Sequence, residues 1–171
     1  MLIATVYVLT GLVWTGRSLL EVLAHPDYWD PVTSLDWLAI WSFSLAFALL
    51  ALTIPLLARD SRAGRLVDVT AASVALAAAL ASVANVIEDA FAVTGASTFY
   101  VIGALGTLVG LIALCVGLWL GRRRSSALVV LLILVGVASM VLGMGWLVLV
   151  GGVLAAENHL SAQRQTDRAH D

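Results

Sequence analysis

Hydrophobic residues form five long runs along this chain, and short links rich in charged or turn-forming residues separate the runs. The hydrocarbon core of a bilayer is about 30 Å thick, so a helix that crosses it needs roughly 20 predominantly apolar residues. Each run is long enough, and each therefore predicts a membrane-spanning helix. The predicted spans cover residues 2–24, 35–58, 67–88, 100–120 and 127–156.

These spans account for most of the chain, so we expect one all-α domain over residues 1–156. It is a polytopic membrane protein with a bundle of five transmembrane helices, followed by a short polar C-terminal tail at 157–171. Composition agrees, because 61% of the 171 residues are hydrophobic and 12% are charged, whereas soluble domains have about 25% charged residues. The lipid bilayer is therefore the first expected partner.

Two local patterns bear on where the helices begin and end. Thr33 and Asp36 are three residues apart at the start of the second span, which predicts a capping box with Asp in place of the usual Glu. A straight helix from Ala127 to Glu157 would cover about 45 Å, well beyond the hydrocarbon core. Four glycines allow this fifth span to break, namely Gly143, Gly145, Gly151 and Gly152.

The distribution of arginine predicts the orientation in the membrane. Six arginines follow the second and fourth spans, at Arg59, Arg62, Arg65, Arg122, Arg123 and Arg124. The other two links contain no Lys or Arg, and short basic loops stay in the cytoplasm. We therefore expect a multi-pass protein of the plasma membrane with a cytoplasmic N-terminus and an external C-terminus. Arg164 and Arg168 in the tail run against this orientation. The six arginines in the links also suit contact with anionic lipid headgroups.

Polar residues share one face of the first span. They recur every three or four residues, as Tyr7, Thr10, Trp14, Arg17, Glu21 and His25, a spacing that places them on one side of a helix. Arg17 lies about 24 Å along this span, where an unpaired Arg costs at least a few kcal/mol. We expect its partner to be Glu21, one turn later, or Glu88 on the third span, with Asn85 as a hydrogen-bonding neighbour.

These residues define a candidate polar layer near the outer surface, made of Arg17, Glu21, Asp36, Asn85 and Glu88. Two interpretations stay open: an Arg–Glu clasp that joins the first helix to the third, or a ligand, ion or proton site open to the outside. Along the third span, Asn85 lies at about 27 Å and Glu88 at about 32 Å. The acidic stretch at 84–89 therefore lies mostly at the membrane edge.

A stripe of small residues follows the fourth span at intervals of three and four. Its members are Gly103, Gly106, Gly110, Ala113 and Gly117. Small residues let a neighbouring helix backbone approach closely, as in GxxxG pairs. The stripe is therefore expected to form a helix-packing seam, either inside the bundle or between two copies of the chain.

No combination of residues in the sequence points to catalysis, a cofactor or a metal. There is no GxSxG or phosphate-binding loop, Cys115 is the single cysteine, and no histidines are paired at metal-ligand spacing. A net charge of −2 gives no basic field that would attract nucleic acid. The expected function is that of a non-enzymatic membrane protein acting through helix packing, or through association with a membrane partner or a second copy. The alternative is a small transporter or sensor with an outward-facing polar site between the first and third helices.

Overall fold

The computed structural model describes residues 2–24, 31–91, 93 and 95–168, and this part of the chain is almost entirely helical. The described residues contain six α-helices: α1 (Leu2–Ala24), α2 (Ser34–Ser61), α3 (Arg65–Asn85), α4 (Ala96–Leu120), α5 (Arg124–Ala138) and α6 (Trp146–Arg168). One π-helical turn, η1 (Val86–Ala90), extends α3, and a short 3₁₀ turn, η2 (Met140–Leu142), follows α5.

The prediction of an all-helical membrane bundle is confirmed. Four helices, α1 to α4, are long and apolar enough to cross a bilayer, and α5 is a shorter apolar helix. Their outward faces are apolar; on α4, for example, Leu105, Val109, Ile112 and Val116 are exposed. Such faces suit contact with lipid.

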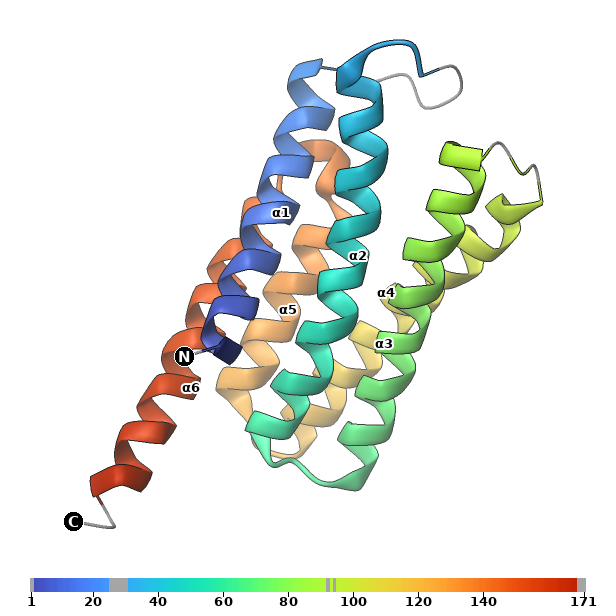
Figure 1. Ribbon diagram of the computed structural model, residues 1–171. Coiled ribbons are helices and arrows are strands. Elements are labelled where there is room, and N and C mark those ends of the chain that lie inside the picture. Colours follow the sequence, from blue (N-terminus) through green and yellow to red (C-terminus); the bar gives the residue numbers. More distant parts are fainter. Residues whose placement is uncertain (1, 25–30, 92, 94, 169–171) are drawn as a thin grey trace.

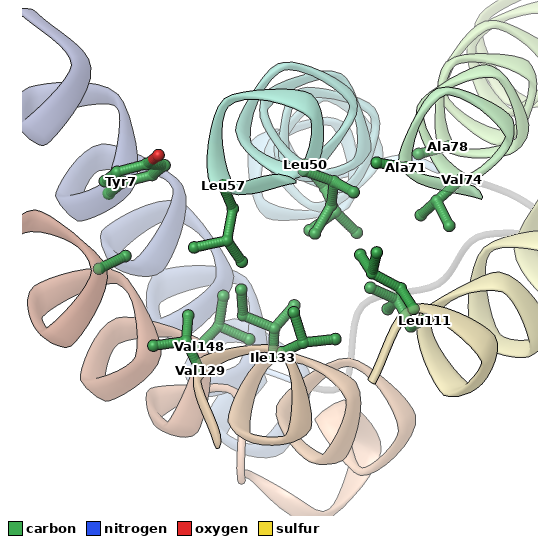
Figure 2. Packing of buried hydrophobic residues seen from close by; sticks show 14 of the residues in the cluster. Tyr7, Leu50, Leu57, Ala71, Val74, Ala78, Leu111, Val129, Ile133 and Val148 are labelled. Carbon is green, nitrogen blue, oxygen red and sulfur yellow. The ribbon is translucent and has the colours of Figure 1, made fainter. Parts of the chain in front are cut away.

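The helices form a closed ring in which each packs against its neighbours in the sequence and α6 returns to α1 (Figure 1). Large apolar side chains fill the centre of the ring. Figure 2 shows part of this core, with Leu50 of α2, Val74 of α3, Leu111 of α4, Ile133 of α5 and Val148 of α6 directed inward. All five are fully or almost fully buried, so every helix from α2 to α6 contributes to one core.

The start of α2 has the predicted cap. The Asp36 backbone N–H donates to Thr33 Oγ1 at 3.2 Å, and the Thr33 backbone N–H donates to Asp36 Oδ2 at 2.7 Å. These reciprocal bonds make the capping box. Asp36 Oδ2 also accepts from the Val32 N–H and the Thr33 hydroxyl. Asp36 therefore caps the N-terminal end of α2, and its hydrogen bonds account for the burial of its side chain.

The fifth predicted span is divided in the structure. Residues 127–156 were expected to form one helix, but α5 ends at Ala138 and α6 begins at Trp146. After this break the chain reverses, so α6 runs antiparallel to α1 with Gly145 beside Trp14, Gly11 beside Leu149 and Gly152 beside Tyr7. The helix then continues to Arg168, so most of the segment expected to be a polar tail belongs to α6.

The reversal brings the two ends of the described chain to the same end of the bundle (Figure 1). The expectation that the termini lie at opposite ends is therefore wrong. The links between α2 and α3 and between α4 and α5 also lie here, and the Arg123 guanidinium donates to the Arg62 carbonyl across them at 3.4 Å. We call this end the basic end, because it carries the six link arginines, Arg59, Arg62, Arg65, Arg122, Arg123 and Arg124.

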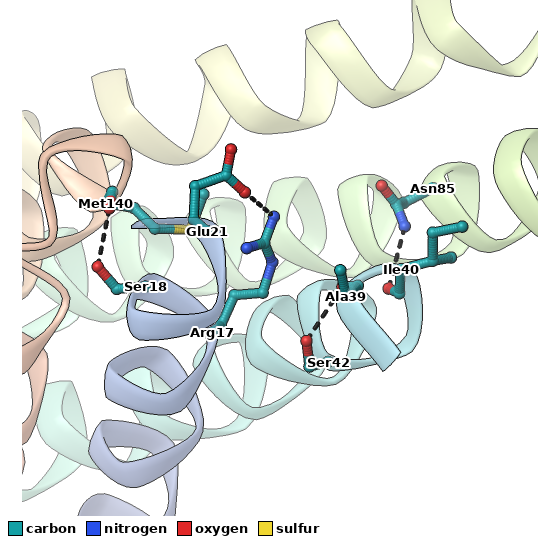
Figure 3. Close-up of polar contacts among 8 residues, drawn as sticks. All are labelled: Arg17, Ser18, Glu21, Ala39, Ile40, Ser42, Asn85 and Met140. Carbon is teal, nitrogen blue, oxygen red and sulfur yellow. Dashed lines mark hydrogen bonds and ion pairs between the residues drawn. The ribbon is translucent and has the colours of Figure 1, made fainter. Parts of the chain in front are cut away.

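Ser18 of α1 holds the reversal in place. Its hydroxyl donates to the Met140 carbonyl at 2.8 Å and accepts from the Gly145 N–H at 3.1 Å, as Figure 3 shows for the first bond. Gly143 has a φ of +76°, a left-handed conformation that Gly adopts without strain. A side chain at Gly145 would place its Cβ 2.5 Å from the Trp14 carbonyl oxygen. The turn thus depends on two glycines and one serine.

The small-residue stripe of α4 lies against α3 inside the bundle. A Cβ at Gly103 would stand 2.5 Å from the Ala81 backbone nitrogen, and one at Gly110 would stand 2.5 Å from a Val74 methyl group. An added Cβ would lie 3.2 Å from the Ala77 Cβ at Gly106, and 3.6 Å from a Val67 methyl group at Gly117. Ala113, the remaining member, is exposed. The seam therefore packs α4 against α3 within one chain.

Candidate functional site

A pocket of about 140 Å³ lies in the half of the bundle opposite the basic end. Four aromatic side chains line it: Trp14 of α1, Phe43 and Phe47 of α2, and Tyr100 of α4. The remaining walls are aliphatic or small and consist of Ala104, Leu108, Val137, Ala138 and Met140. The pocket thus lies between α1, α2, α4 and the end of α5, and its surface is mainly apolar.

The aromatic side chains are fixed by contacts with one another. The Trp14 ring lies edge-on to Phe47 at a centroid distance of 5.4 Å, and Phe43 contacts Phe47 at 5.1 Å and Tyr100 at 5.8 Å. Such tilted pairs are the favoured arrangement of aromatic rings. The Trp14 indole N–H donates to the Ala46 carbonyl of α2 at 3.2 Å. The pocket wall is therefore preorganised.

Over its described residues, the polar face predicted for the first span lies against α2, whereas His25, its last member, lies outside the described part of the chain. Thr10 and Thr53 share a hydrogen bond of 2.7 Å, both buried, and Trp14 bonds to α2 as described. Helix α2 lies between α1 and α3, each of which packs against it. An outward site made by α1 and α3 alone therefore does not match this arrangement, and the pocket is built from other helices.

Arg17 lies beside the pocket, at a depth in the first span where the sequence predicts that an unpaired Arg would be costly. Its side chain is 3% exposed and forms an ion pair with Glu21 at 2.8 Å (Figure 3). Glu21 is one of the two partners expected from the sequence, and the pair lies within α1. The guanidinium also lies over the Phe43 ring, 5.2 Å from its centroid, in a cation–π contact. Arg17 is thus neutralised by a carboxylate and stacked on a pocket wall.

Asn85 of the predicted layer contacts α2. Its side-chain amide donates to Ser44 Oγ at 2.9 Å and to the Ile40 carbonyl at 3.4 Å, and Figure 3 shows the second of these bonds. One turn earlier, the Ser82 hydroxyl donates to the Ser44 carbonyl at 2.8 Å. These bonds join α3 to α2. The buried polar side chain of Asn85 therefore has a structural explanation.

Glu88 belongs to the π-helical turn η1 and is half-buried. Arg17, and after it Asp89 and Glu88, act electrostatically on the Tyr100 hydroxyl group. Tyr100 in turn lines the pocket. The predicted layer is thus divided: Asp36 caps α2, Asn85 joins α3 to α2, and Arg17, paired with Glu21, lies over the Phe43 ring of the pocket wall.

A second polar cluster lies at the basic end and joins three helices. Asp60 Oδ2 of α2 accepts a hydrogen bond from the Tyr7 hydroxyl of α1 at 2.8 Å and lies 2.9 Å from His159 Nδ1 of α6. The His159 side chain is about nine-tenths buried. The cluster fixes the returning helix against α1 and α2. It was not predicted, because the segment 157–171, which includes His159, was expected to be a polar tail on the external side of the membrane.

The sequence also gave little sign of the aromatic pocket. Phe43 and Phe47 are one turn apart on α2, which places them on one face. Trp14 and Tyr100 come from distant segments, however, and only the register between helices brings them together. Within the described residues, no three His, Cys, Asp or Glu side chains are grouped closely enough to hold a metal ion.

Comparison with known proteins adds no further assignment. No family model, no curated protein and no solved structure matches this chain.

Proposed function

We propose that this chain is a non-enzymatic membrane protein that binds a small apolar ligand in its aromatic pocket, as a small transporter or sensor does. The observation that supports this is the pocket itself: about 140 Å³, mainly apolar and walled by four aromatic side chains. Ligand sites are typically concave and apolar with a few placed polar groups. Here Tyr100 carries a hydroxyl group, and the Arg17 guanidinium lies over the Phe43 ring of the wall.

The arginine distribution supports a plasma-membrane orientation with the basic end in the cytoplasm. With α6 folded back, Arg164 and Arg168 belong to the helix that extends toward the basic end. Eight of the nine basic residues then follow the positive-inside rule, and Arg17 is the exception. Both termini are accordingly proposed to be cytoplasmic, and the pocket lies in the outer half of the bundle.

Anionic lipid headgroups are the proposed partner of the basic end. The arginines there lie next to the ends of apolar helices, where headgroups gather, and Arg124 stacks on Trp119 with 5.6 Å between the guanidinium carbon and the ring centroid. Juxtamembrane basic residues gain about 1 kcal/mol each near an anionic surface. This contact fixes the orientation and leaves the opposite half of the bundle for the ligand.

Saturable binding of benzyl alcohol tests the pocket. The probe is radiolabelled and equilibrated with the full chain in nanodiscs, and uptake by empty discs is subtracted to remove partition into lipid. We expect one saturable site per chain. Ala104→Leu, which adds three carbon atoms at the pocket wall, should abolish it.

Ala113→Leu is the matched control, because it makes the same change at an exposed position of the same helix. It should bind as the unmodified chain does. The proposal is overturned if the unmodified chain shows no saturable uptake, or if Ala104→Leu retains it in full.

A further inference from the structure

The pocket lies between two helices that are neighbours in the ring, α4 and α5. Near the basic end these helices are in contact, since the Cys115 thiol donates to the Ala127 carbonyl at 3.5 Å. In the opposite half, Ala104 and Leu108 of α4 line one side of the pocket and Val137 of α5 lines the other. The aromatic side chains of α1 and α2 form its back wall. The two helices are therefore joined at one end and separated by the pocket at the other.

Contacts with other helices hold α4 and α5 apart at this level. A Cβ at Gly103 would stand 2.5 Å from the Ala81 backbone nitrogen, so α4 lies close against α3. A Cβ at Gly136 would stand 2.9 Å from the Val148 backbone nitrogen, so α5 lies close against α6. Each glycine directly precedes a residue of the pocket lining. The separation thus follows from two close helix contacts directed away from each other.

The edge of the pocket between α4 and α5 is apolar and reaches the lipid-facing surface. Ala138 belongs to the lining and is itself exposed, and Leu105 of α4 is exposed beside it in sequence to the lining residue that precedes it. Helix α5 has no polar residue over 127–138. Over 101–112, α4 has only Thr107, which is buried and bonded within its own helix. An apolar molecule in the bilayer therefore meets no polar side chain between these two stretches.

The pocket also lies at the depth that the ends of lipid chains reach. Helices α2 and α4 both begin at this end of the bundle, and Phe43 and Leu108 lie about 14 and 18 Å along them. The hydrocarbon core is about 30 Å thick, so its middle lies about 15 Å from either surface. The pocket is thus beside acyl-chain ends and well below the headgroups.

We infer that the pocket takes the apolar end of a membrane lipid chain, which enters sideways from the bilayer between α4 and α5. An apolar cavity of about 150 Å³ holds benzene in a well-studied case, so a pocket of about 140 Å³ takes about six carbon atoms of a chain, and the rest of the lipid stays in the bilayer. This inference rests on the proposed function, because it assumes that the pocket is a ligand site. It adds the chemical class of the ligand and its route of entry.

Photolabelling from within the bilayer tests the inference. The full chain is placed in nanodiscs with a phosphatidylcholine that carries a diazirine at the end of one acyl chain, and the labelled residues are identified by mass spectrometry after illumination. We expect label on Leu108 and Val137 of the pocket as well as on the lipid-facing Leu105. Saturating benzyl alcohol should suppress the label on Leu108 and Val137 and leave that on Leu105. A six-carbon sulfonate with the same diazirine stays in the water, and it should label Leu108 and Val137 less than the phospholipid does.

Ala138→Phe tests the route, because it places a large side chain at the exposed edge of the pocket. It should lose the lipid label on Leu108 and Val137 and keep the label on Leu105, which reports that the chain is still inserted. The control is Ala113→Phe, the same change at an exposed alanine outside the pocket. It should be labelled as the unmodified chain is.

The two levels of the argument fail in different ways. Absence of saturable benzyl alcohol uptake overturns the proposed function. Three results overturn the lipid-chain inference alone when benzyl alcohol does bind: lipid label confined to residues outside the pocket, stronger pocket labelling by the sulfonate than by the phospholipid, or unchanged pocket labelling in Ala138→Phe.

Discussion

Gly103→Ala tests the closest helix contact in the bundle with the smallest change. The added Cβ would lie 2.5 Å from the Ala81 nitrogen, 2.8 Å from the Ala77 carbonyl oxygen and 2.9 Å from the Ala81 Cα. All three are backbone atoms, which no rotamer change can move. Ordinary contact begins at 3.4 Å, so α3 and α4 would have to separate locally by about 0.9 Å.

A matched substitution isolates the cost of this clash. Gly16 of α1 has no atom within 4 Å of an added Cβ, so Gly16→Ala brings the helix-propensity gain of about 0.8–1.0 kcal/mol without a clash. Gly103→Ala brings the same gain plus an overpacking cost of about 1–3 kcal/mol. The expected difference in unfolding free energy between the two variants is therefore about 1–3 kcal/mol. Gly110→Ala should fall between them, since it meets a valine methyl group.

The assay is equilibrium unfolding of the purified chain in mixed detergent micelles, followed by tryptophan fluorescence. Gly16→Ala should be as stable as the unmodified chain or slightly more stable, and Gly103→Ala less stable. Equal stability of the two alanine variants would refute the close approach of α3 and α4.

Three further predictions concern the topology and the polar contacts. A fluorescent protein fused to the C-terminus should fluoresce, and alkaline phosphatase fused there should be inactive; the reverse pattern contradicts a cytoplasmic basic end. Tyr7→Phe should cost about 1.5 kcal/mol of unfolding free energy by removing the bond to Asp60, and a change below a few tenths in the same unfolding assay would contradict that bond. Glu21→Leu should cost more unfolding free energy than Arg17→Leu, because it leaves the more buried charge unpaired: Arg17 is 3% exposed and Glu21 is 21% exposed. The double variant should be more stable than Glu21→Leu alone. Additive effects in the double-mutant cycle would contradict the pair.

The sequence predicts the first four helices well, because their signal is local. An apolar run of about 20 residues reports on the bilayer whatever its neighbours do, and the Thr33–Asp36 cap depends on residues three apart. The Arg17–Glu21 pair is predictable for the same reason, since residues four apart meet on one helix face.

The break in the last apolar run was less predictable. Residues 127–156 are apolar throughout, and glycines alone do not decide between a tilted helix and a reversal. The decision depends on Ser18, 122 residues before the Met140 carbonyl that it contacts. Once the reversal is missed, His159 is assigned to the wrong side and its contact with Asp60 cannot be foreseen.

The aromatic pocket depends on the packing of helices that are distant in the sequence. The amphipathic spacing of α1 indicates an inward face, but it does not say whether α2 or α3 covers it. In the structure α2 does, and this brings Trp14 to Phe43 and Phe47. Tyr100 joins them because the glycine seam sets how α4 lies against α3.

The location of a bound ligand tests the central claim most directly. Crystals of the chain grown with 4-iodobenzyl alcohol can be examined at a wavelength where iodine scatters anomalously, which locates the probe without interpretation of weak density. The account predicts one strong anomalous peak within the pocket, among Trp14, Phe43 and Tyr100, and no such peak in Ala104→Leu crystals. A peak found only on the lipid-facing surface, or a pocket without iodine at a saturating probe concentration, would contradict it.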